Sequence, residues 1–530
     1  MPDLSLDIRK SSVVSKKADR KKIRGLPALT PKLPVPQLSR AQRRELRGIE
    51  ASMEYADSYR DWSILAQAHD KVSGRETWRE QSGSDLFDYE QVQRRYQLLR
   101  NCCDQNDIEG LLFALNEGIH GNMGGMGQAK LYRQSRFGTK RIIHDYVDVV
   151  IESLHRVYDA DDSEVPFEDK LDFFRRARHC YGRSALSFSG GAGLVYFHHG
   201  VVNALLEEDL LPQVLAGSSA GAWMCAQIGT RTDDELREHF KTFRYSAYEG
   251  MNFKKALQMR DWEQAEDARL SMIDELSGDM TFQEAFEHTG RYINISISPA
   301  EKHQTSRLMN AITSPNVTIA SAVRASSAVP GISEPVMLEA KDARGNLKPY
   351  LASRRWTDGS MAQDIPTKPL SRLFGVNHLL VSVINPLALP FVSDPKVRKE
   401  NMRRSVNAVL SAIGRETVKT SRRVLEAIGR DEWVDSLDMV NTMISQDFTG
   451  DINMILTADE FHWRQVAFFY RGESEIQAMI KAGEKATWPR MEMIRNCSAI
   501  SRELDDLMQR IDERDLRESH VPRRRHMTQL

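Results

Sequence analysis

The stretch LAGSSAGA, Leu215–Ala222, decides the fold around it because it holds the pattern Gly-x-Ser-x-Gly, from Gly217 to Gly221. An apolar segment leads into the pattern and a helix-like segment follows it, which is the strand–turn–helix context of a displayed nucleophile. Such a turn is strained and has no room for large side chains two positions away on either side. The two glycines supply that room, so we predict a sharp turn that displays Ser219, with Ser218 as a spacer. The N-terminus of the following helix then faces the site, where its dipole favours a developing anion.

By itself this pattern fits an ordinary tight turn as well as a catalytic one. A serine nucleophile also needs a base. His198 and His199 precede the serine on a predicted helix, and His378 opens an apolar strand, so we assign structural roles to all three. Asp358 is the other candidate. Gly359 follows it and leaves room for a substrate, although Asp-Gly also forms ordinary turns.

A glycine turn at Gly190 and Gly191 closes a short apolar strand and precedes a helix. Backbone N–H groups at such a turn can point at a tetrahedral oxyanion. The rival interpretation is a dinucleotide site, but the pattern Gly-x-Gly-x-x-Gly fails because Tyr196 stands at its last position after Gly191 and Gly193. We therefore favour an anion-stabilising turn over a nucleotide site.

Short apolar strands alternate with helical segments outward from these turns, which indicates a parallel sheet covered by helices on both faces. We expect this α/β domain to span residues 184–390. The predicted strands are 185–188, 211–217, 292–299, 316–323, 335–340 and 378–386, and the predicted helices include 195–209 and 219–229.

The regions on either side have a different character. Residues 1–39 are basic and contain several prolines, and up to Glu50 the chain has 13 Lys and Arg against 5 Asp and Glu. We predict a largely disordered tail that is able to touch an anionic surface. Residues 40–178 place apolar side chains at three- and four-residue spacing, which predicts a helical domain. Residues 391–530 read as charged and helical.

Composition excludes several classes of protein. The 530 residues carry a net charge of −1, so the whole molecule offers no long-range field for nucleic acid. The five cysteines form no Cys-x-x-Cys pair, which favours a reducing compartment without a disulfide framework or a zinc site. The N-terminus lacks an apolar signal segment, and no apolar stretch reaches the ~20 residues of a spanning helix. We expect a cytoplasmic protein that uses no metal. If it works on lipid, it does so from the surface.

Four segments, taken in order, resemble the patatin-like phospholipase family. The resemblance covers about Leu186 to Pro386 and implies a three-layer, parallel-sheet hydrolase domain. The segments are SFSGGAGLVYFHHGVV (187–202), GSSAGA (217–222), VRASSAVPGI (323–332) and DGS (358–360).

The resemblance implies a Ser–Asp dyad that needs no histidine, metal or cofactor. Ser219 matches the family's nucleophile and Asp358, followed by Gly359, its general base. The oxyanion glycines of the family are matched by Gly190, Gly191 and Ala192.

The segments before Ser184 resemble the helical domain that precedes the patatin domain in fungal and bacterial triacylglycerol lipases. This implies a hydrolase that releases fatty acids from acylglycerols or phospholipids at a membrane or lipid-droplet surface. Ala192 and Val195 depart from the family, which has glycine at both positions; a positive φ at Ala192 would cost of order 1 kcal/mol. A lysolipid acyltransferase and a weakly active lipid-binding pseudoenzyme remain the alternatives.

Overall fold

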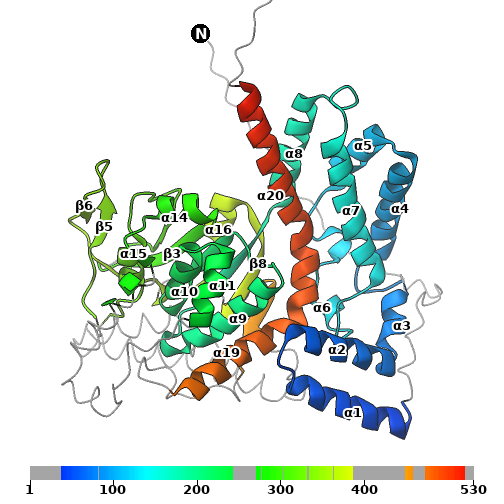
Figure 1. Ribbon diagram of the computed structural model, residues 1–530, viewed down its shortest axis with the longest axis horizontal. Helices are drawn as coiled ribbons and strands as arrows, with labels where there is room; N and C mark the ends of the chain where they lie inside the picture. Colours follow the sequence, from blue (N-terminus) through cyan, green and yellow to red (C-terminus); the bar gives the residue numbers. More distant parts are fainter. Residues whose placement is uncertain are drawn as a thin grey trace, which may run out of the picture.

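The computed structural model describes residues 38–81, 83–242, 270–301 without 272 and 276, 304–330, 333–361, 363–385, 448–457 and 472–519. The predicted basic tail lies outside these residues, apart from its last two positions. In the described part of the chain, an α/β unit lies beside an all-helical unit, and the long helix α20 (Met491–Ser519) runs between them (Figure 1).

The main sheet has the strand order β4-β3-β2-β1-β8-β9, and β7 also pairs with β3. Five strands (β1, β2, β3, β8 and β9) run parallel, as predicted, whereas β4 and β7 run antiparallel to β3. A separate hairpin joins β5 to β6. The strands are β1 (Arg183–Phe188), β2 (Val214–Gly217), β3 (Tyr292–Pro299), β4 (Arg307–Met309), β5 (Leu338–Lys341), β6 (Leu347–Tyr350), β7 (Trp356–Asp358), β8 (Val376–Val383) and β9 (Ile452–Ile455).

Successive residues of the central strands face two different cores. Leu186 and Leu215 belong to one buried cluster, whereas Ala185 and Ala216 belong to the other. This period-two alternation gives the sheet two apolar faces, and helices cover both. One face packs against α9, α10, α15 and α19 and the other against α16, which makes the predicted three layers. The helices are α9 (Val195–Glu207), α10 (Ala220–Gly229), α11 (Asp233–Thr242), α14 (Phe282–Thr289), α15 (Ile319–Ser326), α16 (Thr367–Phe374) and α19 (Glu473–Thr487).

The all-helical unit forms where the three- and four-residue spacing predicted it. Its first helix begins at Arg40, and Ser39 caps it by a reciprocal pair of hydrogen bonds with Gln42. A buried carboxylate, Asp70, accepts the backbone N–H groups of Arg136 and Phe137 at 2.8 and 2.9 Å. The helices are α1 (Arg40–Glu54), α2 (Tyr59–Ser73), α3 (Arg75–Glu80), α4 (Tyr89–Gln105), α5 (Ile108–Gly118), α6 (Ala129–Tyr132), α7 (Arg141–Asp159) and α8 (Phe167–Tyr181).

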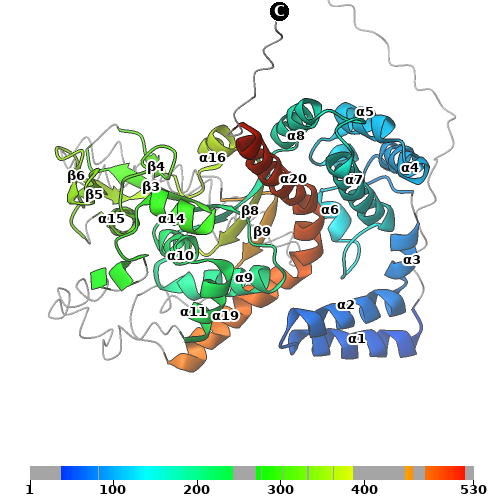
Figure 2. The ribbon, with the colours of Figure 1, turned by 45° about the horizontal axis from the view of Figure 1, so that its top comes forward.

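Helix α20 joins the two units. It packs against α7, α8 and β1, and both views show it between the sheet and the N-terminal helices (Figures 1 and 2). Asp505 of α20 pairs with Arg178 of α8 at 2.5 Å and with Arg183 of β1 at 2.8 Å. A single carboxylate therefore links an element of each unit to α20. Among the described residues, no helix is both long enough and apolar enough to cross a membrane.

Two sequence predictions about secondary structure are wrong. Residues 316–323 do not form a strand: α15 begins at Ile319, after Thr318 at the N-cap position. The β-branched residues of this segment misled the prediction, since Ile319 and Val323 lie four residues apart on a buried helical face whose other residues are mostly small. The region 391–530 is also not wholly helical, because β9 extends the sheet beside β8.

Candidate active site

Ser219 lies between the end of β2 and the start of α10, with φ 51° and ψ −116°. Residues other than glycine rarely adopt this region, so the backbone is strained here. A Cβ atom on Gly217 would lie 2.3 Å from the carbonyl of Gly221, and one on Gly221 would lie 2.2 Å from the carbonyl oxygen of Phe188. Only glycine fits at either position, which is the steric reason for the motif. Ser219 itself is 8% exposed.

Helix α15 holds the backbone of this turn from the side. The Ser326 hydroxyl accepts the N–H of Ser219 at 3.0 Å and donates to the carbonyl of Ser296 on β3 at 2.7 Å. One residue later, Ser327 accepts the indole N–H of Trp223 at 2.9 Å. These serines were not predicted as site residues; their only signal was their place in the segment 323–332.

Asp358 ends β7, whose pairing with β3 places it opposite Ile297. Its side chain is buried and accepts the N–H of Ser360 at 2.8 Å, and the Ser219 side chain lies near enough to influence its pKa. Burial raises the pKa of Asp358 to about 6; the hydrogen bonds from Ser360 and Ser219 oppose this rise, and the charge of Asp364 adds to it. The structure thus brings Ser219 and Asp358 into contact from distant parts of the chain.

The glycine turn after β1 lies beside both residues. A Cβ atom on Gly190 would lie 3.0 Å from Cβ of Ser360 and 3.4 Å from Cβ of Ser219. The N–H of Gly190, however, donates to Oδ1 of Asp364 at 2.7 Å. This corrects one sequence prediction: Gly190 lines the site, but its amide is already bonded and does not face an oxyanion.

The backbone N–H groups of the other two residues of the turn are not engaged in the way that the N–H of Gly190 is. Among the described residues, the structure records no acceptor for the N–H of Gly191 or Ala192. Gly191 is extended, at φ 165°, whereas Ala192 has φ 50°, in the left-handed region that favours glycine. Ala192 therefore has the positive φ for which the sequence predicted a conformational cost of order 1 kcal/mol.

The three histidines are engaged away from Ser219. His198 is buried, with Nδ1 at 2.7 Å from the Ser382 hydroxyl and Nε2 at 2.9 Å from the Ser189 carbonyl, and burial lowers its pKa to about 4. His199 packs on the Phe240 ring, with ring centroids 4.0 Å apart. Nδ1 of His378 lies 3.0 Å from the Ser184 hydroxyl. These contacts agree with the structural roles assigned from the sequence.

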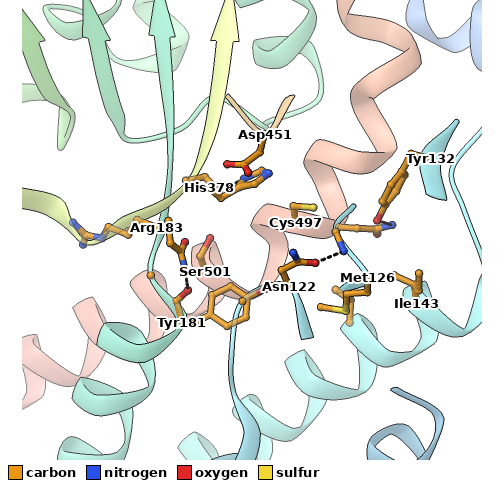
Figure 3. Close-up of a pocket in the computed structure, with 17 residues that line it drawn as sticks. Asn122, Met126, Tyr132, Ile143, Tyr181, Arg183, His378, Asp451, Cys497 and Ser501 are labelled. Carbon is orange, nitrogen blue, oxygen red and sulfur yellow. Dashed lines mark hydrogen bonds between the residues drawn. The ribbon is translucent and has the colours of Figure 1, made fainter. Parts of the chain in front are cut away.

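A cavity of about 280 Å³ opens at the opposite edge of the sheet, at the amino ends of β1 and β8 (Figure 3). Its wall combines Arg183 and His378 from these strands with Tyr132 from the helical unit and Cys497 from α20. The residues of the Ser219 site follow the carboxyl ends of the strands and do not line it. Among the residues that the structure describes, this cavity included, no three His, Cys, Asp or Glu side chains are grouped to hold a metal ion.

Comparisons with known proteins divide the chain as the structure does. Residues 39–179 match a family described as a domain of unknown function (DUF3336), and residues 186–371 match the family described as patatin-like phospholipase.

Several curated proteins are similar over most of this chain. Triacylglycerol lipase SDP1L of Arabidopsis thaliana is 32% identical over 472 residues, which cover 86% of this chain and 57% of that protein. A patatin-like phospholipase domain-containing protein of Pyricularia oryzae is 37% identical over 374 residues, or 66% and 47% of the two chains. One from Cryptococcus neoformans is 33% identical over 495 residues, or 87% and 54%. The chain therefore spans about half the length of the curated relatives it matches.

The two family matches, the similarity to these relatives and the turn geometry around Ser219 agree with one another. On these grounds residues 186–371 of the chain form a patatin-like phospholipase domain, which a DUF3336 domain precedes.

Proposed function

We propose that this chain is a serine lipid acyl hydrolase, with Ser219 as nucleophile and Asp358 as general base. The observation that carries the proposal is the placement of Ser219, on a strained strand–helix turn, beside a buried carboxylate whose pKa burial has raised to about 6 and the Ser219 side chain lowers. A base works best when its pKa lies near the operating pH, because it is then largely ionised and still accepts a proton readily.

The reaction proceeds in two halves. Ser219 Oγ attacks the ester carbonyl carbon, and its proton passes to the Asp358 carboxylate. The tetrahedral intermediate collapses, the ester C–O bond breaks, and Asp358 returns the proton to the leaving alcohol. A water molecule then gives its proton to Asp358 and attacks the acyl-Ser219 ester. Asp358 passes this proton to Ser219 Oγ as the acyl C–Oγ bond breaks, which releases the fatty acid and restores the free serine.

The negative charge of the intermediate is stabilised by the amides of Gly191 and Ala192, with the N-terminus of α10 adding its dipole. Fixed hydrogen-bond donors of this kind contribute much of the rate acceleration in acyl transfer, because removing one lowers the rate about 10²- to 10³-fold. Gly190 contributes by its small size and not as a donor, because its N–H is bonded to Asp364.

The substrate class rests on the relatives. Triacylglycerol lipase and patatin-like phospholipase are the names of proteins similar to most of this chain. We infer that acylglycerols or phospholipids are the substrates. Such substrates reside in a lipid phase, so the protein has to reach a membrane or lipid-droplet surface, and the basic N-terminal segment is our candidate for that contact.

The test compares Ser219→Ala with Ser218→Ala in the full-length protein, because the two variants remove the same atom from adjacent buried residues. With a soluble short-chain ester, we expect Ser219→Ala to lower kcat at least about 10³-fold and Ser218→Ala to stay within about tenfold of the wild type. Mass spectrometry after a fluorophosphonate probe should find the label on Ser219 only.

Equal loss in both variants would show that Ser219 is not the nucleophile. A folded wild type that neither hydrolyses esters nor takes up the probe would indicate the lipid-binding pseudoenzyme. Acyl transfer to added lysophospholipid, at the expense of free fatty acid, would indicate the acyltransferase. A panel of purified lipid classes then ranks the substrates of an active enzyme.

A further inference from the structure

Asp364 is a buried carboxylate in the loop between β7 and α16, and its accessible surface is 0% of the maximum. Its Oδ1 accepts the N–H of Gly190 at 2.7 Å and the hydroxyl of Ser218. Its Oδ2 accepts the side-chain amide of Asn385 at 2.9 Å. Burial raises the pKa of Asp364 above its ordinary value, and these three donors oppose the rise by stabilising the ionised form.

The three partners belong to three different segments of the chain. Gly190 lies in the turn after β1, Ser218 in the turn after β2, and Asn385 just beyond the end of β8. Asp364 therefore binds the carboxyl ends of three adjacent parallel strands to one another. Two of them carry the proposed oxyanion amides and the proposed nucleophile.

A second residue braces the same turn from behind. The Ser189 hydroxyl accepts the N–H groups of Ile384 and Asn385 at 2.8 and 3.2 Å, and the Ser189 N–H donates to the Ser382 carbonyl at 3.1 Å. These bonds fix Ser189 to the strand end of β8. The next residue, Gly190, is held on the side of the proposed nucleophile by its N–H bond to Asp364. Among the described bonds, this is the one that fixes Gly190 on that side.

We propose that Asp364 is a positioning residue that sets the spacing between the oxyanion turn and the nucleophile, acting through Gly190 and Ser218. This proposal rests on the proposed function. Asp364 itself touches neither substrate nor reacting atoms. The amides of Gly191 and Ala192 must lie about 3 Å from the developing oxyanion while Ser219 Oγ is bonded to the same carbon. A displacement of about 1 Å between the two turns is enough to cost about 10²-fold in rate.

The charge of Asp364 has a separate effect that a purely structural residue would lack. Burial is the main reason for the raised pKa of Asp358, and the negative charge of Asp364 raises it further. Ser219 and Ser360 are the other groups that act on Asp358 there, and both are uncharged donors. Removal of the Asp364 charge therefore moves the pKa of Asp358 down.

The helical unit offers a matched control. Asp70 is likewise buried and accepts two backbone N–H groups, from Arg136 and Phe137, at 2.8 and 2.9 Å. It braces a loop of the helical unit and takes no part in the turns around Ser219. Asp70→Ala is thus the same chemical change as Asp364→Ala at a place remote from the proposed chemistry.

The experiment measures kcat, KM and pH dependence on a soluble ester, at a temperature where each full-length variant is folded by near-ultraviolet circular dichroism. We expect Asp364→Ala to lower kcat about 10- to 100-fold with KM within about threefold. The conservative Asp364→Asn keeps the size and one acceptor oxygen, so it should keep more of kcat and move the acidic limb of kcat/KM to lower pH. Asp70→Ala should change the melting temperature and leave kcat and the pH profile unchanged.

Hydrogen exchange gives a readout that does not depend on turnover. The amides of residues 189–194 should exchange faster in Asp364→Ala than in the wild type or in Asp70→Ala. A kcat within twofold of wild type in folded Asp364→Ala, or an equal loss in Asp70→Ala, would overturn the proposal. If the wild type hydrolyses nothing, the proposed function fails, and the exchange of residues 189–194 alone decides the positioning role, with unchanged exchange refuting it.

Discussion

At the scale of single residues, the burial that suits Asp358 to its proposed role as a base also affects stability. Burial raises its pKa to about 6 in the folded protein, whereas an unperturbed aspartate has a pKa of 3.8. The folded state therefore holds this proton more tightly than the unfolded state does. Stability is lost as the pH rises from about 4 through about 6, and the loss persists above that range.

We expect Asp358→Asn to abolish ester hydrolysis and to raise the free energy of unfolding at pH 7.5. The gain is at most about 3 kcal/mol, which is the difference between the two pKa values converted to energy, and it should shrink at pH 4.5. Wild-type kcat/KM should rise with pH and level off above about 6. Urea denaturation at the two pH values measures the stability. Asp342→Asn is the control, since Lys348 lowers the pKa of that partly buried carboxyl and the gain should be absent. Activity near wild type in Asp358→Asn would rule out the dyad.

Ala192 offers a second prediction at this scale. Its φ of 50° is unfavourable for a residue with a Cβ atom, and glycine removes the strain. We expect Ala192→Gly to raise the free energy of unfolding by about 1 kcal/mol and to leave activity equal or higher. Gly191→Ala should do the reverse, because its Cβ would lie 2.6 Å from Cγ1 of Ile384. A large loss of activity in folded Ala192→Gly would show that this turn does not hold an oxyanion as we propose.

At the scale of elements, α9 and α19 approach so closely that glycine is required at their crossing. A Cβ atom on Gly200 would lie 1.8 Å from the carbonyl oxygen of Ile480, and one on Gly483 would lie 2.1 Å from that of Phe197. Helix α9 carries the residues that follow the oxyanion turn, so this crossing also sets where the turn can lie. A change at Gly200 should therefore separate the two helices.

We expect Gly200→Ala to lower the free energy of unfolding by about 2–4 kcal/mol. Gly48→Ala in α1 is the matched control, since no atom lies within 4 Å of its added Cβ atom. That change should stabilise by about 0.5–1 kcal/mol, because alanine is the better helix former. Chemical denaturation of both variants measures the difference. Equal stability of the two would show that the helices adjust without cost.

At the scale of the whole molecule, the basic N-terminal segment is the proposed contact with an anionic lipid surface. Residues 1–37 contain nine Lys and Arg and three Asp. Deleting them leaves Ser39, which caps α1, so the fold should be unaffected. We expect the deletion to weaken co-sedimentation with anionic liposomes and to spare hydrolysis of a soluble ester. Each basic residue near such a surface contributes at most about 1 kcal/mol, and salt near 1 M reduces the Debye length to ~3 Å and should abolish the difference. Equal binding by both forms at low salt would place docking elsewhere on the molecule.

Local sequence determined the features that depend on sterics and periodicity. The Ser219 turn was predictable because glycines at 217 and 221 are required by contacts within one strand–turn–helix segment. The parallel strands β1, β2, β3 and β8 were predictable because each is a short apolar run between helices, and α1–α8 because their apolar residues repeat at helical spacing. The short strands β4, β7 and β9 had no such signal, because three or four residues carry too little pattern.

Tertiary structure alone decided which residues meet at the site. Asp358 was one candidate base in the sequence, which a family resemblance singled out, and its raised pKa arises from burial that no local pattern encodes. Part of the segment 316–323 lies in helix α15, which packs on β3, and this helix places Ser326 against the backbone of Ser219. Asp364 was not among the residues singled out from the sequence, because only the folded chain brings three strand ends to its carboxylate, which accepts the N–H of Gly190. Each of these outcomes joins segments far apart in the chain, so it depends on how the layers pack and not on any one stretch of sequence.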